Sequence, residues 1–362
     1  MTRLQWERLA WVLGVVGLIG IALGWSSQPT EFPHAWLAAL TAWLAWPLGS
    51  LGLLLIHALT GGRWGYALRP QLSAAVRTLW LLVPAVIPWL LTLPALYEWA
   101  RPGAAAHLGN SFYLNRPFFF GRGAVYLVCW LGLGALACRA VQTEQPDRAL
   151  ARIAPGGLIL LALTITFSAI DMTMSLDPHF TSSDYGLITI AEMGLFALAV
   201  AVFAAAQDAA AMSAELLTIL GKLLVGLVLL WAYLDFMQLL ILWESDLPHD
   251  AGWFLVRDSG GWGITAALIA ATHFVLPWFA LIVPRIRRSP RAIAAVTGLL
   301  AVSGVLRSWW LVVPASGLGF GLIDVAAMLC LLGIGAALSL REPRNRPPMP
   351  ARPLAAGEQH GR

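Results

Sequence analysis

The sequence has few charged residues for its length. Of its 362 residues only 12% are Asp, Glu, Lys or Arg, while 59% are hydrophobic. Soluble domains carry roughly 25% charged residues, so a soluble fold of this composition could not cover its apolar interior with polar surface. We therefore expect the lipid bilayer to be the solvent of this chain. The net charge of +4 comes from arginines spread along the sequence and gives no reason to expect a nucleic-acid partner.

Residue patterns that hold metals or haem are also scarce. The three cysteines, Cys129, Cys138 and Cys330, are too few and too scattered for a disulfide framework, a zinc site or an iron–sulfur cluster. The Cys-x-x-Cys-His motif of covalently bound haem does not occur. His57 and His273 could be axial ligands of a b-type haem, but their expected depths differ and no second pair is available. We expect no metal, no haem and no covalently bound cofactor.

Ten hydrophobic runs are long enough to cross about 30 Å of hydrocarbon, which takes roughly 20 helical residues. The sequence therefore predicts an all-α integral membrane protein of about ten transmembrane helices. Residues 1–340 are expected to form a single polytopic domain, and residues 341–362 a disordered Arg/Pro-rich tail. The first run is expected to be retained, because Trp25-Ser26-Ser27 is a poor signal-peptide cleavage site. The runs lie near residues 9–25, 35–58, 79–97, 123–142, 154–173, 186–208, 217–243, 262–284, 292–313 and 318–340.

Arginines are distributed unevenly between the predicted loops. Because basic segments stay inside, both termini are predicted to be cytoplasmic. The acidic outer loops would suit a basic soluble partner, although such loops also occur without one. The arginines on the predicted inside are Arg3, Arg8, Arg63, Arg69, Arg77, Arg139, Arg148, Arg152, Arg285, Arg287, Arg288, Arg291 and those of the tail. The predicted outer loops hold only Arg101, Arg116, Arg122 and Arg257, with the acids Glu31, Glu98, Asp177, Asp184, Glu244, Asp246, Asp250 and Asp258.

Ionisable side chains within the predicted spans are costly, so each is a candidate functional group. Most of them fall in the predicted outer half of the membrane. Lys222 is near an inner helix end, where a long side chain most simply extends to the interface. Arg307, beside two tryptophans, is equally compatible with an interfacial anchor or with a salt bridge to an acid. The candidates for a proton path are Glu192, Asp235, His273, Arg307 and Asp324, with Arg307 as the counter-charge.

The densest polar stretch runs from Thr164 to Tyr185. On a helix Asp171 and Ser175 share one face, and Pro178 then breaks the helix, which would bring His179 near the same outer pocket. A carboxylate, a histidine and hydroxyls at an interface can accept the two protons of a quinol. The same residues are equally compatible with a helix cap and turn. The candidates for a quinone site are Asp171, Ser175, Asp177 and His179.

This stretch also carries a family resemblance. Residues 170–180, Ile-Asp-Met-Thr-Met-Ser-Leu-Asp-Pro-His-Phe, resemble the Asp-Trp-x-Met-Ser-Leu-Glu-Pro-His-Trp signature of the ActF subunit of bacterial alternative complex III, a quinol:cytochrome c oxidoreductase. Met172 and Phe180 replace the two tryptophans of the signature, and Asp177 replaces its glutamate. The resemblance covers most of residues 50–315, and continues in the segments 59–65, 113–119, 220–224, 230–248 and 273–277.

The resemblance implies a multi-pass protein of the bacterial inner (cytoplasmic) membrane, with two four-helix bundles and a further helix pair. It implies a subunit without a redox centre, not catalytic alone, that contributes a quinone-facing site, a proton pathway, or both. The ligand would be menaquinone or ubiquinone. The partners would be the lipid bilayer, a paralogous membrane subunit, an iron–sulfur protein and c-type cytochromes, with a terminal oxidase as a further possible partner.

Two other functions compete with this one. A purely structural assembly subunit would keep the fold without needing buried acids. A secondary transporter would use charges near the membrane midplane and broken helices in matched halves. Here the charges cluster outward and the internal repeat is faint, so the sequence favours the oxidoreductase subunit.

Overall fold

The computed structural model describes residues 2–103, 109–207, 212–245, 248–317 and 319–341. Within these ranges the regular structure is helical without a strand, and ten helices are long and apolar enough to cross a membrane. The expected all-α fold with about ten spans is confirmed. Arg341 ends the last helix, and residues 342–362, for which the sequence predicts a disordered tail, lie outside the described residues.

The helices follow the hydrophobic runs, but two of the spans are built from two segments each. The spans are α1 (Arg3–Ser27), α2 (Phe32–Thr60), α3 with α4 (Arg63–Arg77 and Leu82–Leu91), α6 (Arg116–Val141), α7 (Pro146–Met172), α8 (Tyr185–Ala206), α9 (Ala214–Ser245), α11 with α12 (Trp262–Ile269 and Leu276–Ile282), α14 (Pro290–Val312) and α15 (Leu322–Arg341). The short helices between spans are α5 (Leu93–Leu96), α10 (Pro248–Asp258) and α13 (Pro284–Arg287).

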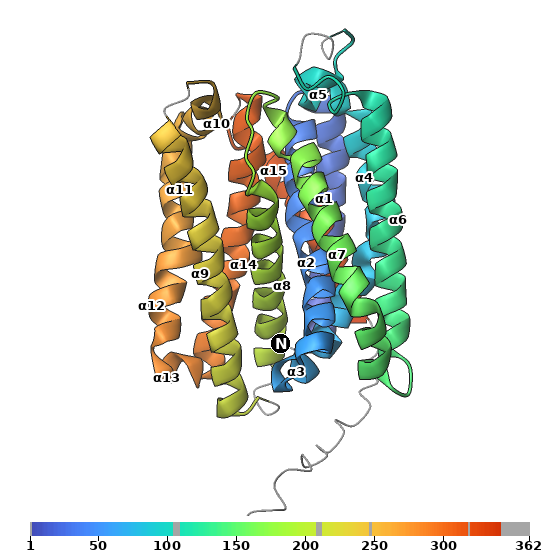
Figure 1. Cartoon of the computed structure of the whole chain (residues 1–362), viewed down its shortest axis with the longest axis vertical. Coiled ribbons are helices and arrows are strands. Elements are labelled where there is room, and N and C mark those ends of the chain that lie inside the picture. Colours follow the sequence, from blue (N-terminus) through green and yellow to red (C-terminus); the bar gives the residue numbers. More distant parts are fainter. Residues whose placement is uncertain (1, 104–108, 208–211, 246–247, 318, 342–362) are drawn as a thin grey trace, which may run out of the picture.

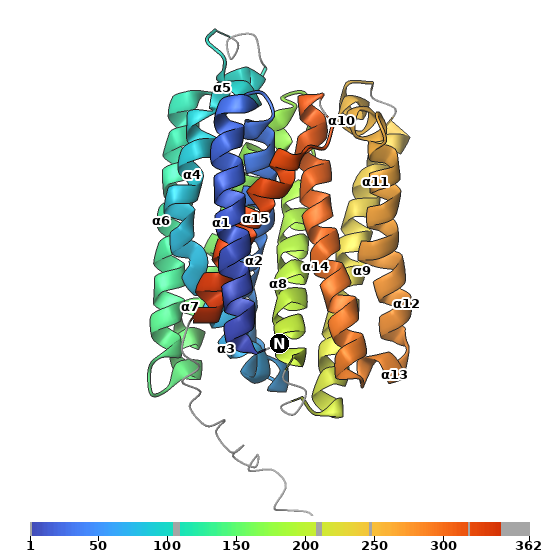
Figure 2. The ribbon, with the colours of Figure 1, turned by 180° about the vertical axis from the view of Figure 1, so that it is seen from behind.

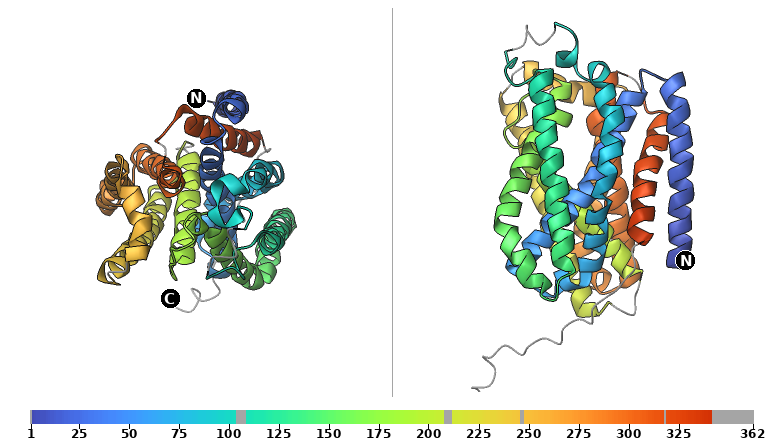
Figure 3. Two further views of the ribbon diagram at one scale, coloured as in Figure 1. Left: turned by 90° about the horizontal axis from the view of Figure 1, so that it is seen from above. Right: turned by 90° about the vertical axis from the view of Figure 1, so that its right-hand side faces the viewer.

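The spans form two four-helix bundles and a further pair, as expected (Figures 1 and 3). The first bundle contains α2, the α3–α4 span, α6 and α7. The second contains α8, α9, the α11–α12 span and α14. Helices α1 and α15 pack closely on each other, and α15 also lies against α2 on the outside of the first bundle.

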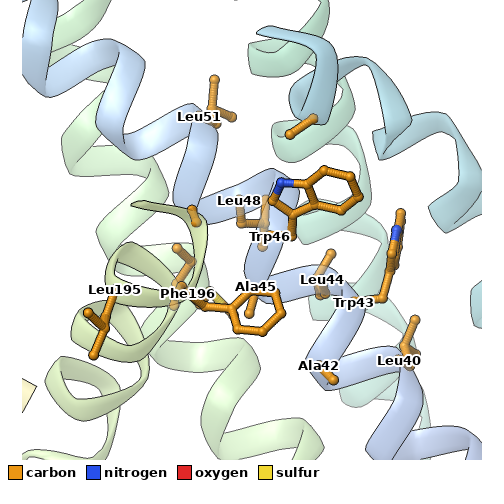
Figure 4. Packing of buried hydrophobic residues seen from close by; sticks show 14 of the residues in the cluster. Leu40, Ala42, Trp43, Leu44, Ala45, Trp46, Leu48, Leu51, Leu195 and Phe196 are labelled. Atoms are coloured by element: carbon orange, nitrogen blue, oxygen red, sulfur yellow. The ribbon is translucent and has the colours of Figure 1, made fainter. Parts of the chain in front are cut away.

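Helix α2 is the centre of the molecule. It contacts α7 of its own bundle, α8 and α14 of the other bundle, and α15 of the pair. Its side chains are buried along most of its length, including the large rings of Trp43 and Trp46. These rings pack towards α15, where a Cβ added at Gly335 would lie 2.6 Å from Trp43 Nε1. Figure 4 shows Leu195 and Phe196 of α8 on the other side of α2, with Phe196 beside Ala45. This apolar seam between the bundles is therefore protein core and not a lipid-facing surface.

Glycines allow the closest helix contacts. At Gly49 of α2, an added Cβ would lie 1.9 Å from the carbonyl oxygen of Met193 on α8. At Gly17 of α1, it would lie 2.2 Å from the backbone nitrogen of Cys330 on α15. Real Cβ atoms do not tolerate such distances, so small residues fix both crossings, as they commonly do between membrane helices.

The eighth span changes geometry in its middle. Residues Ala270–Val275 form a π-helical turn between α11 and α12. Pro277 lies two residues after this turn and has no N–H to continue the regular hydrogen bonding. Such widened turns commonly occur at functional positions, and this one carries His273, which is completely buried.

Both described ends of the chain lie on the same side of the molecule (Figure 2). Helix α1 begins there, and α15 runs down to that side. The arginine-bearing helix α13 lies there as well, whereas α5 and α10 cap the opposite side. This arrangement agrees with an even number of spans. We call the side that carries α10 the α10 side.

Candidate functional site

Asp171 is the most buried acid of the polar stretch that the sequence singles out. It lies in the last turn of α7 and is only 1% exposed. Arg122 of α6 donates to both carboxylate oxygens, from Nε over 2.9 Å and from Nη2 over 2.7 Å. The hydroxyl of Tyr126 donates a third hydrogen bond over 2.7 Å. Three donors from α6 thus satisfy this carboxylate and tie α6 to α7.

The expectation that Arg122 lies in an outer loop is wrong. It lies in the second turn of α6, and its side chain is 10% exposed. Its guanidinium stacks over the rings of Tyr113, at 3.7 Å, and Phe118, at 4.4 Å, and donates to the Tyr113 carbonyl over 3.0 Å. The ion pair with Asp171 and the two rings replace the water that the charge would have in a loop.

The other three quinone-site candidates make local contacts around the end of α7. The Ser175 hydroxyl donates to the Asp171 carbonyl over 2.8 Å, and the backbone N–H of His179 donates to the Asp177 carboxylate over 3.0 Å. The side chain of His179 is exposed, whereas that of Asp171 is buried. These are the contacts of a helix end and a turn, which was the alternative that the sequence left open.

The polar stretch instead fixes the position of α10. The ring of Phe180 stacks on Trp253 of α10, with centroids 4.7 Å apart and planes 11° apart, and both residues are buried. Tyr185, at the start of α8, packs in the same small cluster and donates from its hydroxyl to Thr173 over 2.8 Å. The segment from Asp171 to Tyr185 thus supports α10 through the stacking of Phe180 on Trp253.

Four of the five proton-path candidates come together from four different helices. We call Glu192, Asp235, His273 and Arg307 the Arg307 cluster. Nη2 of Arg307 lies 2.5 Å from Asp235 Oδ1, and its Nε lies 3.9 Å from Glu192 Oε2. Nε2 of His273 lies 3.2 Å from the same Glu192 oxygen. The cluster is thus a chain of charged and titratable groups within the second bundle.

The Arg307 cluster contains buried polar atoms without a hydrogen-bond partner. These are Glu192 Oε2 and both ring nitrogens of His273. The 3.2 Å contact between His273 Nε2 and Glu192 Oε2 lacks hydrogen-bond geometry, so it is a close electrostatic contact. The ring of Trp231 lies edge-on to His273 at 4.5 Å, and its Nε1 is also unpartnered. Buried polar atoms of this kind are sites for water or a ligand.

Asp324 does not belong to this cluster. It lies in the first turn of α15, in the helix pair outside the first bundle, and accepts the Gly321 N–H over 2.8 Å. A carboxylate that bonds a backbone N–H at a helix start is a capping group. We therefore remove Asp324 from the candidate path.

A cavity of about 900 Å³ adjoins the Arg307 cluster on the α10 side. Its walls come from α8, α9, α11 and α14, and α10 covers it; we call it the α10 pocket. Asp235 and Arg307 line it directly, with Gln238 as another polar group. Ligand pockets measure roughly 300–1,000 Å³ and combine apolar walls with a few polar groups, as here. The apolar lining includes Tyr185, Leu229, Trp231, Tyr233, Phe236, Leu239, Trp253, Phe254, Phe274 and Trp310.

A smaller cavity of about 60 Å³ lies on the other side of Arg307, between the two bundles. Arg307 and Thr189 line both cavities, and Glu192 lines the smaller one. Its volume has room for a few water molecules, since one needs roughly 10–15 Å³ of this measure. Its other hydroxyl-bearing lining residues are Thr41, Ser168, Thr173 and Ser308.

The sequence does not single out the residues of α10. Arg257 is 2% exposed, although it was expected in a loop. Burial lowers the pKa of Arg257 to about 9, and the nearby Tyr185 and Asp177 act against this shift. The spacing of Trp253 and Arg257, four residues apart, is the one signal that could have indicated a helix here.

Among the described residues, no group of three or more His, Cys, Asp or Glu side chains is arranged to hold a metal ion. No protein-family profile matches the sequence, and no characterised protein matches it at a significant level.

Proposed function

We propose that this chain is a quinol-binding membrane subunit of a bacterial quinol:cytochrome c oxidoreductase of the alternative complex III type, similar to ActF. The observation that carries the proposal is the α10 pocket, which combines aromatic walls with Asp235 and Arg307 at its lining. Quinol rings are flat and apolar with two hydroxyl groups, so they need aromatic or aliphatic walls together with a few hydrogen-bond partners. The sequence resemblance is the support for the partner complex.

Oxidation of a quinol releases two electrons and two protons. The electrons would pass to the iron–sulfur and haem partners that the resemblance implies. Asp235 can accept the two hydroxyl protons in turn, passing the first on before it takes the second, because its side chain is 38% exposed and lines the pocket. The 2.5 Å contact with Arg307 holds that carboxylate in place. This step needs only Asp235 to face the ligand.

The smaller cavity offers the next position for a proton. Glu192 lines it and lies beside both Arg307 and His273. Its hydroxyl-bearing walls can hold water, which would carry protons away from the pocket. The proposed quinone site therefore lies in the second bundle, and not at Asp171 and His179 as the sequence indicates. The Arg307 cluster keeps its proposed part in proton transfer.

A purely structural subunit is the second candidate. The fully satisfied Asp171–Arg122–Tyr126 cluster favours it, since such a cluster only joins helices. The α10 pocket, with Asp235 and Arg307 at its lining, favours the quinol-binding subunit, because a structural role needs no cavity of this size.

Quinone binding by the purified full chain in lipid nanodiscs tests the proposal. Ala267 lines the α10 pocket and is exposed, so Ala267→Trp should fill the pocket without disturbing a packed core. We expect saturable binding of a short-chain ubiquinone or menaquinone analogue, weakened about tenfold or more by Ala267→Trp. Ala124→Trp, at an exposed position of α6, is the matched control and should bind like the wild type. Absence of saturable binding, or equal binding by both variants, would contradict the proposal.

A further inference from the structure

Arg257 is a buried cation that forms no ion pair within 4 Å among the described residues, and the Asp177 carboxylate acts on it only from a longer distance. Nη1 of Arg257 donates to the Trp253 carbonyl over 2.8 Å, and its Nη2 donates to the Leu311 carbonyl over 2.5 Å. The guanidinium carbon lies 3.2 Å from the centre of the Trp253 ring. Its Nε has no hydrogen-bond partner. In contrast, Arg307 has Asp235 and Glu192 within 4 Å.

A buried charge without a counter-charge is costly, and these contacts do not supply one. An anion bound beside the guanidinium of Arg257 would therefore stabilise it. Two carbonyls and an aromatic face reduce the cost of burial but do not cancel the positive charge. Asp258 follows Arg257 directly, yet its carboxylate packs against Gly263, where an added Cβ would lie 2.4 Å from Oδ1. Arg257 and Asp258 both line the α10 pocket, and Arg257 is 2% exposed, so a ligand would meet the guanidinium in the wall of the pocket.

The surroundings of Arg257 indicate which kind of anion fits. Helix α10 connects the end of α9 to the start of α11, so it lies at the level where spans leave the bilayer. Below it, apolar residues line the pocket and are open to the outside, among them Phe236 with 59%, Leu239 with 44% and Leu255 with 65% exposure. In a membrane these side chains face lipid. A ligand here would have an anionic group at interface depth and an apolar part beside α9.

We infer that Arg257 binds the phosphate of an acidic phospholipid, whose acyl chains lie along the exposed side chains of Phe236 and Leu239 at the outer edge of the α10 pocket. The guanidinium provides charge-assisted hydrogen bonds to the phosphate oxygens, and the surplus positive charge favours an acidic lipid over a zwitterionic one. This inference goes beyond the proposed function and does not depend on it, since the lipid would bind whether or not the same pocket admits a quinol.

Lipid binding by the full chain can be measured with native mass spectrometry. The chain is released from detergent with dioleoylphosphatidylglycerol or dioleoylphosphatidylcholine added at increasing mole fraction. We expect one phosphatidylglycerol to bind in preference to phosphatidylcholine. Arg257→Gln should raise the half-saturating mole fraction of phosphatidylglycerol about tenfold or more. Arg101→Gln, an exposed arginine on the same side, is the control and should leave it unchanged.

A second variant tests the inference in case Arg257→Gln does not fold. Leu239→Trp changes a half-exposed apolar residue of the pocket and leaves Arg257 in place, and it should also weaken phosphatidylglycerol binding. Equal binding of the two lipids by the wild type would overturn the inference. Displacement of phosphatidylglycerol by millimolar inorganic phosphate would show an ion site without lipid specificity and would overturn it too. A chain that binds quinone without preferring phosphatidylglycerol would contradict this inference and leave the proposed function standing.

Discussion

Individual buried charges in this protein have two kinds of surroundings, which suit two different purposes. The carboxylate of Asp171 has three donors from α6 and no remaining exposure, so it stabilises the first bundle. His273 is completely buried and Glu192 is 12% exposed. Among the described residues, Glu192 Oε2 and both ring nitrogens of His273 lack hydrogen-bond partners, which suits groups that exchange protons or bind water. The sequence identifies all three residues as costly inside a membrane. It does not distinguish the two purposes, because the difference lies in the distance to neighbours on other helices.

Asp171→Asn should therefore destabilise the protein. The substitution leaves the buried Arg122 guanidinium without its counter-charge, and breaking a buried pair of this kind costs about 3–5 kcal/mol. We expect a clear loss of folded protein and a lower melting temperature in detergent. The remaining folded protein should still bind a quinone analogue, because Asp171 does not line the α10 pocket.

His179→Ala is the control for this prediction. The His179 side chain is exposed, so its removal should leave the melting temperature unchanged. A normal melting temperature of Asp171→Asn together with lost quinone binding would contradict this prediction. It would support a quinone site at Asp171, as the sequence indicates.

The limits of the helices could largely be predicted from the sequence, because each span needs one apolar run of sufficient length. Three elements were not predictable in this way. Helix α10 is too short and too polar to stand out, and its importance comes from the stacking of Trp253 on Phe180. The π-helical turn at Ala270–Val275 leaves the hydropathy of its span unchanged. The close crossing at Gly49 depends on which helix lies opposite.

Gly49→Ala should separate α2 from α8. The new Cβ would meet the Met193 backbone at 1.9 Å, and a backbone cannot give way as a flexible side chain can. Overpacking of a buried contact costs about 1–3 kcal/mol, so we expect a lower melting temperature. Gly226→Ala on α9 is the matched control, because an added Cβ there meets no atom within 4 Å. It should melt like the wild type, and an equal drop in both variants would contradict the account of this crossing.

At the scale of the whole molecule, the arrangement into two bundles and a pair agrees with the expectation, but the runs alone do not imply it. Hydropathy gives the spans and not their neighbours, so this part came from the family resemblance. The location of the proposed ligand site could not be predicted either. Asp235 and Arg307 are 72 residues apart in the sequence, and only packing brings α9, α10 and α14 around one cavity.

The arginine distribution predicts that both termini are cytoplasmic. We expect reporter fusions at residue 341 and at the N-terminus to give a cytoplasmic signal, and fusions in the loop after α6, near Thr143, to do the same. Fusions at Ser259, between α10 and α11, should give the opposite signal. A C-terminus on the opposite side from the N-terminus would contradict the even number of spans, and reversal of all signals would contradict the orientation alone.

The most direct test of the account is where a bound quinone lies. An azido-quinone can be photolysed on the wild-type chain in nanodiscs, and the labelled peptides can be identified by mass spectrometry. The account predicts labels within residues 229–242 of α9 and around Trp253 or Ala267, and predicts that Ala267→Trp suppresses them. Labels confined to the segment from Asp171 to His179, or labels that Ala267→Trp does not reduce, would contradict a quinol site in the α10 pocket.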